Sequence, residues 1–283
     1  MSQGTMTATT RPEVLIDLAL QGGGSHGAFT WGVLDRLLGR WSLDNSPAYL
    51  AFDLMTRVFS PYHLNPLDHN PLRTILAESI DFDRLARSSI KLFITATSVR
   101  TGRGRIFRNG QISADVLLAS ACLPTMFQAI EIDGEYYWDG GYAGNPTITP
   151  LVRESDAHDT ILVQINPRER TDIPRTANEV LNRLNEISFN SPLMKELRMI
   201  ALLRQVAEPG HGEGARWAGM RIHRIWTDRL AEFGASSKLN AEWAFVAMLK
   251  EEGRRSAHQF LAAHAADLGK QSTADLDVLL QEC

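Results

Sequence analysis

Residues 15–38, LIDLALQGGGSHGAFTWGVLDRLL, hold the pattern that decides the fold. The apolar run at residues 14–20 is typical of a strand that is covered on both faces inside a parallel sheet. The glycines at residues 22–27 predict a turn in which the backbone approaches a partner closely, because glycine has no side chain in the way. Apolar residues then recur at helical spacing over residues 28–38. The stretch therefore predicts a strand, a glycine turn and a helix.

Composition and charge restrict the class of protein. The 283-residue chain, with 44% hydrophobic and 22% charged residues, is long enough to bury a full core. Its net charge is −4 and its lysines and arginines are scattered, so we expect no nucleic-acid partner. The two cysteines, Cys122 and Cys283, lie far apart, which argues against a disulfide framework and favours a reducing, cytoplasmic location. The oligomeric state stays open.

The chain shows no targeting or membrane-spanning pattern. Residues 1–13, MSQGTMTATTRPE, are polar and lack the apolar region of a signal peptide, so they are predicted to form a disordered tail. No run approaches the roughly 20 apolar residues that a membrane span requires. We therefore expect no transmembrane segment.

Strand and helix patterns alternate along the rest of the chain. Apolar runs typical of strands occur at residues 91–97, 159–165 and 221–226. Helical patterns occur at residues 48–59, 111–121, 177–187, 192–207 and 240–253. Asn70 before Pro71 predicts a helix start, and Asp133-Gly134 predicts the turn of a hairpin. The alternation predicts an α/β core with a mostly parallel sheet at residues 14–166, followed by a mainly helical region at residues 167–283.

The glycine turn fits three kinds of site. Gly22, Gly24 and Gly27 have the spacing of a dinucleotide fingerprint, which calls for an acidic residue about 20 positions further on at the end of a second strand. Asp44 has this spacing, but the residues before it, GRWSL, do not form a strand pattern. An NAD(P) site is therefore the less favoured hypothesis.

The second and third alternatives both concern acyl transfer. Residues 23–27, GGSHG, match G-x-S-x-G, the nucleophile elbow of serine hydrolases, with Ser25 as the nucleophile. In the third alternative the backbone N–H groups of Gly23, Gly24 and Ser25 point outward at a helix N-terminus, where free donors and the helix dipole favour negative charge. This arrangement is typical of an oxyanion hole.

Four stretches together resemble a known family. GGGSHGAF at residues 22–29, ATSVRTG at 96–102, ASACLP at 119–124 and YYWDGGYAGNP at 136–146 are similar to those of bacterial patatin-like proteins. These proteins are lipid acyl hydrolases that use a Ser–Asp dyad, and the resemblance extends from Val14 to the C-terminal helices. It implies a layered α/β fold that hydrolyses acyl esters of phospholipids or neutral lipids, with neither metal nor organic cofactor.

The resemblance also assigns roles to residues. Asp139 of Asp139-Gly140-Gly141 matches the dyad aspartate, which accepts the proton of the nucleophile. The oxyanion hole falls on the glycine turn, at Gly22, Gly23, Gly24, Ser25 and Gly27. A lipid acyl ester is the expected partner, with peripheral contact to a membrane surface as an open possibility.

One part of the family pattern is missing. The family carries a second strand, a G-x-S-x-G elbow and a long buried helix after the first helix, whereas this chain passes near residues 38–41 directly into GRWSLDNSP. Neither Ser98 nor Ser120 has the flanking glycines of an elbow. Without its nucleophile a serine hydrolase keeps only about 10³–10⁴-fold acceleration over water. We therefore expect an inactive or impaired hydrolase, with strand edges and apolar faces left uncovered.

Two alternatives remain open beside this expectation. In the first alternative Ser25 is the nucleophile, which requires that it leaves the oxyanion site and lies within hydrogen-bond distance of Asp139. The other alternative is a lipid-binding or scaffold protein that keeps the fold without chemistry.

Other candidate residues have structural explanations. His26 is expected to be a partly exposed residue at a helix start, and Cys122 a buried packing residue. His63, Asp68 and His69 are expected in a solvated loop, not in a metal site. The apolar helix at residues 48–59 is expected to pack on the core, with an acyl site or membrane surface as the alternative.

Overall fold

The structure, a computed structural model, describes residues 14–38, 70–170, 173–206, 212–233, 237–238, 240, 242–276 and 278. Several predictions concern residues outside this set: the tail at 1–13, the junction at 39–41, Asp44, the helix at 48–59, and His63, Asp68 and His69.

A three-stranded parallel sheet forms the centre of the fold. It contains β1 (Ile16–Leu20), β6 (Asp159–Val163) and β7 (Arg221–Ile225) in the order β1-β6-β7. Every residue of β6 is buried, because helices cover both faces of the sheet. The α/β class and the strands of residues 14–20, 159–165 and 221–226 are thus confirmed. Since β7 pairs with β6, the C-terminal region completes the core.

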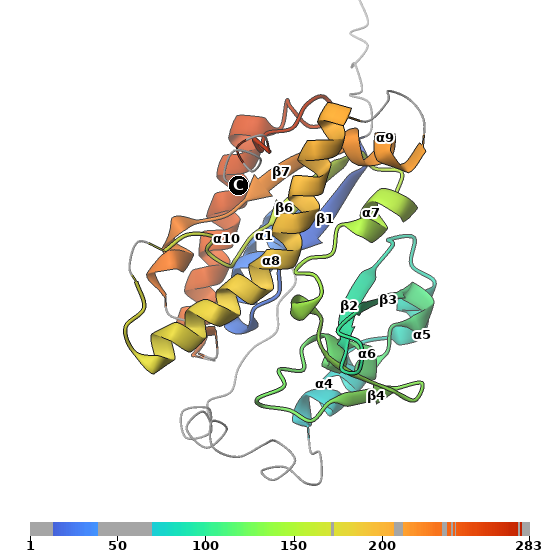
Figure 1. Cartoon of the computed structure of the whole chain (residues 1–283), viewed down its shortest axis with the longest axis vertical. Coiled ribbons are helices and arrows are strands. Elements are labelled where there is room, and N and C mark those ends of the chain that lie inside the picture. Colours follow the sequence, from blue (N-terminus) through green and yellow to red (C-terminus); the bar gives the residue numbers. More distant parts are fainter. Residues whose placement is uncertain are drawn as a thin grey trace, which may run out of the picture.

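Two helices cover one face of the parallel sheet (Figure 1). These are α1 (Gly27–Leu38) and α10 (Trp243–His264), which bury Phe29, Val33 and Leu249 against strand residues such as Ile161. The helices pack closely, because a Cβ on Gly32 would clash with the carbonyl of Lys250.

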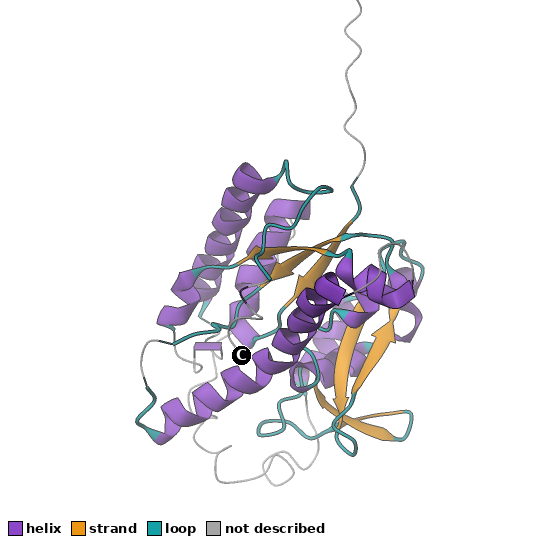
Figure 2. Ribbon diagram, turned by 45° about the horizontal axis from the view of Figure 1, so that its top comes forward, coloured by secondary structure: helices purple, strands orange, loops and turns teal. Residues whose placement is uncertain are grey.

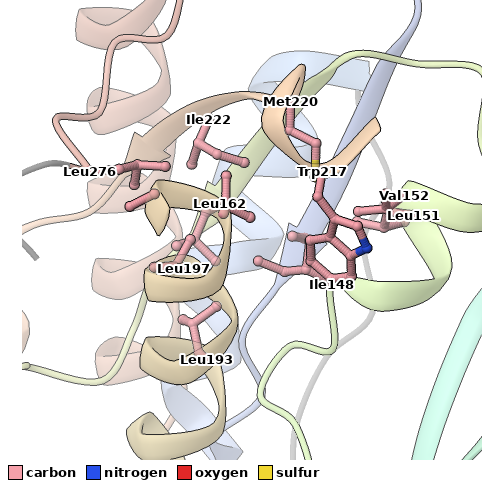
Figure 3. Packing of buried hydrophobic residues seen from close by; sticks show 13 residues of the cluster. Ile148, Leu151, Val152, Leu162, Leu193, Leu197, Trp217, Met220, Ile222 and Leu276 are labelled. Carbon is pink, nitrogen blue, oxygen red and sulfur yellow. The ribbon is translucent and has the colours of Figure 1, made fainter. Parts of the chain in front are cut away.

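The opposite face carries the long helix α8 (Ala177–Val206) with the shorter α7 (Thr149–Glu154) and α9 (Gly212–Ala218). Figure 3 shows Leu193 and Leu197 of α8 pointing toward Leu162 of β6 and Ile222 of β7. The sequence predicted separate helical patterns at residues 177–187 and 192–207, whereas the structure has one helix that continues through Pro192. The shared apolar face outweighs the hydrogen bond that the proline lacks.

A second, antiparallel sheet was not predicted. It contains β2 (Phe93–Ser98), β3 (Gly104–Arg108), β4 (Ile130–Ile132) and β5 (Glu135–Asp139) in the order β3-β2-β5-β4. Figure 2 shows the two sheets as separate groups of strands. Three helices accompany this sheet: α4 (Pro71–Ser79), α5 (Phe82–Ala86) and α6 (Ala114–Ser120).

Two local predictions in this region are confirmed. Asn70 caps α4, since its side chain accepts a hydrogen bond from the amide of Leu72. Asp133 and Gly134, with φ values of 55° and 76°, form the turn between β4 and β5.

β1 forms an edge of the parallel sheet. Within the described residues it pairs with β6 alone, and Val14, Leu15 and Ile16 are 39%, 57% and 37% exposed. None of the helices described here is long and apolar enough to span a membrane.

Candidate active site

The glycine turn is fixed by the side chain before it. Gln21 follows β1, and its Oε1 accepts hydrogen bonds from the amides of Ile165 and Asn166, each at 2.9 Å. These residues follow β6, so the turn is anchored at the carboxyl end of the central strand. The turn then enters the short 3₁₀ helix η1 (Gly24–His26) and α1. The predicted order of strand, turn and helix is confirmed.

The partner that the glycine backbone approaches is the protein itself. Gly24 has a φ of 54°, and a Cβ on it would clash with the carbonyl oxygen of Lys238. A Cβ on Gly23 would lie 2.9 Å from Cδ1 of Ile165. Gly27 has no neighbour within 4 Å of such a position, so close approach does not require a glycine there. The segment at residues 237–238 therefore covers the glycine turn.

Ser25 is held by the same segment. Its hydroxyl donates to the carbonyl oxygen of Lys238 at 2.7 Å and lies 3.3 Å from that of Ser237. The Ser25 hydroxyl is thus directed to backbone carbonyls.

His26 is buried, and the prediction of a partly exposed side chain is wrong. It is 2% exposed because Phe245 of α10 and Phe233 cover its ring. Its Nε2 lies 2.7 Å from the hydroxyl oxygen of Ser237. Burial lowers the pKa of His26 to about 4, and the nearby charges of Lys238 and Arg170 act in the same direction. The imidazole is therefore neutral at neutral pH.

Asp139 ends β5 and begins η3 (Gly140–Tyr142). Its Oδ1 accepts a hydrogen bond of 2.7 Å from the amide of Gly141. Burial raises the pKa of Asp139 to about 6, although the Gly141 amide and the charge of Lys238 act in the opposite direction. A carboxyl group with this pKa exchanges protons near neutral pH, as a general base must.

The two glycines after Asp139 are required by packing. A Cβ on Gly140 would clash with the carbonyl of Thr95, and one on Gly141 with the ring of Phe189 in α8. Residues with side chains would not fit at these two positions, because the chain after Asp139 packs directly against β2 and α8.

Asn145 joins the Asp139 loop to the glycine turn. Its Oδ1 accepts from the amide of Gly22 at 2.8 Å, and its Nδ2 donates to the carbonyl of Gly22 at 3.3 Å. Gln21 donates to the backbone carbonyl of Asn145 at 3.0 Å. The loop after Asp139 therefore contacts the glycine turn, although the turn follows a strand of the parallel sheet and Asp139 ends a strand of the antiparallel sheet.

Lys238 is the charged residue of the site that the sequence did not indicate. Its Nζ donates to Oδ1 of Asn166 at 2.5 Å, and its charge acts on both Asp139 and His26. Burial lowers the pKa of Lys238, while Glu186 and Asp139 oppose this shift. Lys238 lies in ASSKLN, which contains no recognisable motif, so no sequence signal marked it.

The candidate serines are engaged elsewhere. The hydroxyl of Ser98 accepts from the amide of Thr101, and that of Ser120 donates to the carbonyl of Leu117. Over the described residues, no hydroxyl group hydrogen-bonds to the carboxylate of Asp139. Ser42, Ser46 and Ser60 lie outside those residues. No cluster of three or more potential metal ligands occurs in the part that the structure describes.

Comparison with protein families gives one match. Residues 64–152 match the family model of the patatin-like phospholipases. The matched segment contains the antiparallel sheet and the Asp-Gly-Gly motif, and it begins after the glycine turn. A search of curated proteins found no match to the chain. This part of the chain is therefore similar to the patatin-like phospholipases, and the mixed α/β fold is compatible with that family.

Proposed function

We propose that this protein binds lipid acyl esters at the glycine turn and Asp139 but hydrolyses them poorly or not at all. One observation supports this proposal above the others. The carboxylate of Asp139 hydrogen-bonds to the Gly141 amide and interacts with the charge of Lys238, and no serine hydroxyl contacts it among the described residues.

The chemistry of a Ser–Asp dyad explains why this contact matters. The serine oxygen attacks the ester carbonyl, the aspartate takes the serine proton, and backbone N–H groups stabilise the oxyanion. Asp139 can accept a proton and Gly23, Gly24 and Ser25 can donate hydrogen bonds. Among the described residues no attacking oxygen lies beside them, which supports the proposal that no acyl-enzyme forms.

The position of Lys238 supports the same proposal. Its backbone carbonyl lies against Gly24, on the turn where the oxyanion would bind. An ester must displace this segment before its carbonyl reaches the glycine amides. The proposed activity is therefore low for two reasons: the missing nucleophile and the covered turn.

The same contacts weigh against the other hypotheses for the turn. As an elbow nucleophile, Ser25 would have to release the carbonyl of Lys238. As a dinucleotide site, Gly24 would have to receive a phosphate where Lys238 lies. A lipid-binding or scaffold role without catalysis agrees with the contacts, and it shares the prediction of little ester turnover.

Hydrolysis of short-chain nitrophenyl esters tests the proposal. We expect the full chain, Asp139→Asn and Ser25→Ala to give the same low rate, because neither residue supports an acyl-enzyme. Turnover that is lost in Ser25→Ala would contradict the proposal and identify Ser25 as the nucleophile. Cosedimentation with phosphatidylcholine vesicles tests the binding part separately, and absence of binding would contradict it.

A further inference from the structure

A separate cavity lies on the far side of the parallel sheet from β1. It has a volume of about 920 Å³ and is bounded by β7, α8, α10, residues 273–276 and Val278. A smaller cavity of about 250 Å³ adjoins it and shares Gln164, Arg224 and Trp226. These residues lie at the carboxyl ends of β6 and β7, where open α/β sheets bind ligands. Neither the glycine turn nor Asp139 lines these cavities.

One part of the larger cavity is apolar. Its walls include Met194 of α8, Trp226 and Val278, and the last two are 47% and 44% exposed. Leu193 and Leu197, which also line it, are buried in the packed core that Figure 3 shows. The volume falls within the roughly 300–1,000 Å³ of small-molecule sites. This part is suited to an apolar chain.

The other part contains an arginine without a carboxylate partner. The guanidinium of Arg224 lies 3.8 Å from the ring centre of Trp226, and Arg224 lines both cavities. No hydrogen bond or ion pair joins it to a carboxylate within the described ranges of the chain. Burial lowers the pKa of Arg224 and the charge of Arg168 adds to this effect, while Asp228 and Glu169 oppose it. A partly buried cation in these surroundings is stabilised by a bound anion.

Two other arginines of the same cavity share one carboxylate. Arg229 forms an ion pair of 3.2 Å with Glu252, and Arg255 pairs with the same carboxylate. The Glu252 side chain also accepts from the hydroxyl of Thr227. Asp228, Glu232 and Asp275 also line the cavity, but none of them forms an ion pair with Arg224 within the described part of the chain. Arg224, beside Trp226, is therefore the position that we assign to an anion.

We propose that this cavity binds an amphiphile with one anionic head group, either a carboxylate or a phosphate. The head group would pair with Arg224, and the apolar chain would lie along Met194, Trp226 and Val278. A neutral lipid would leave Arg224 without an anion, and a purely polar anion would leave the exposed Trp226 and Val278 in contact with water. The proposal concerns a different site from the glycine turn and does not depend on ester hydrolysis.

Titration of the full chain with dodecanoate and dodecyl phosphate, below their micellar concentrations, tests this proposal by calorimetry. We expect at least one of them to bind, and the comparison of the two identifies the preferred head group. Dodecanol, which has the same chain without a charge, should bind at least about 10-fold more weakly. Equal binding of dodecanol, or no binding of either anion, would overturn the proposal.

Two variants locate the head group. Arg224→Gln should weaken binding of the anionic amphiphile about 10-fold or more, whereas Arg229→Gln, in the same cavity wall, should change it less than about 3-fold. Circular dichroism checks that both variants fold. Trp226→Phe should remove most of the tryptophan fluorescence change that accompanies binding. Equal affinities of Arg224→Gln and Arg229→Gln would contradict the assignment to Arg224.

Discussion

Asp159 and Asp139 both stand at strand ends, but their surroundings differ. Asp159, at the start of β6, is 0% exposed and binds Arg221 at 2.6 and 3.0 Å, His223 at 3.0 Å and the amide of Gly269 at 2.9 Å. Burial acts to raise the pKa of Asp159, but these bonds outweigh it and hold the pKa below its ordinary value. The carboxylate of Asp139 accepts a hydrogen bond from the Gly141 amide alone among the described residues, and its pKa is raised. A buried carboxylate whose hydrogen bonds and ion pairs offset the cost of burial supports the fold. A buried carboxylate with fewer such partners has a raised pKa and is available for proton transfer.

The neighbours of Asp139 extend this contrast. Burial shifts the pKa values of His26 and Lys238 toward the neutral forms, as it does for Asp139. Burial of these three ionisable groups around the glycine turn therefore lowers the stability of the fold. At the amino end of β6 the cost of burying Asp159 is offset, because Arg221 and His223 pair with its carboxylate.

Removing Asp159 should have the largest effect on stability. Asp159→Ala leaves Arg221 and His223 without their buried partner, so we expect the free energy of unfolding to fall by about 3–5 kcal/mol. Urea denaturation followed by circular dichroism measures this loss. A loss below about 1 kcal/mol would mean that the paired charges at β6 contribute no more than a surface ion pair.

His26 should make the fold sensitive to acid. Its pKa is about 4 in the folded protein against an ordinary 6.5, so the unfolded chain takes up a proton that the folded protein does not as the pH falls from 6.5 toward 4. Stability conferred by neutral His26 is thus present above pH 6.5 and lost below it. Relative to wild type, His26→Gln should gain about 2 kcal/mol between pH 7 and pH 4.5. An unchanged difference between the two proteins over this range would show that His26 is not held neutral.

Asp139 should act in the opposite direction. Its pKa is raised from 3.8 to about 6, so the folded protein retains a proton that the unfolded chain loses as the pH rises through this window. Asp139→Asn should therefore be more stable than wild type by about 2 kcal/mol at pH 8, with the advantage disappearing near pH 4. Thermal unfolding at the two pH values measures it. If Asp139→Asn were less stable than the wild type by the same amount at both pH values, Asp139 would have a structural role like that of Asp159.

The local elements of the fold were predictable where short stretches determine them. Strand, glycine turn and helix follow directly from residues 14–38, and Asp133-Gly134 specifies its hairpin. The antiparallel sheet was not predicted, because strand patterns do not reveal which strands pair. The sequence also divided α8 at Pro192, whereas packing of its apolar face keeps the helix continuous.

The candidate site was predictable only in part, for a similar reason. Motifs indicated the glycine turn and Asp139, and Asn145 joins them in the fold. The burial of His26 and the position of Lys238 depend on contacts between residues more than 200 positions apart in the chain. No local pattern carries such information, so the covering of the glycine turn emerged only from the structure.

Labelling by a fluorophosphonate, followed by intact-protein mass spectrometry, tests most directly whether Asp139 lacks a nucleophile. The reagent forms a covalent adduct with serines that a neighbouring base activates. We predict no adduct on the wild-type chain, and the same result for Ser25→Ala and Asp139→Asn. Stoichiometric labelling of the wild type that disappears in Asp139→Asn would show that an activated serine faces this carboxylate, and would contradict the account.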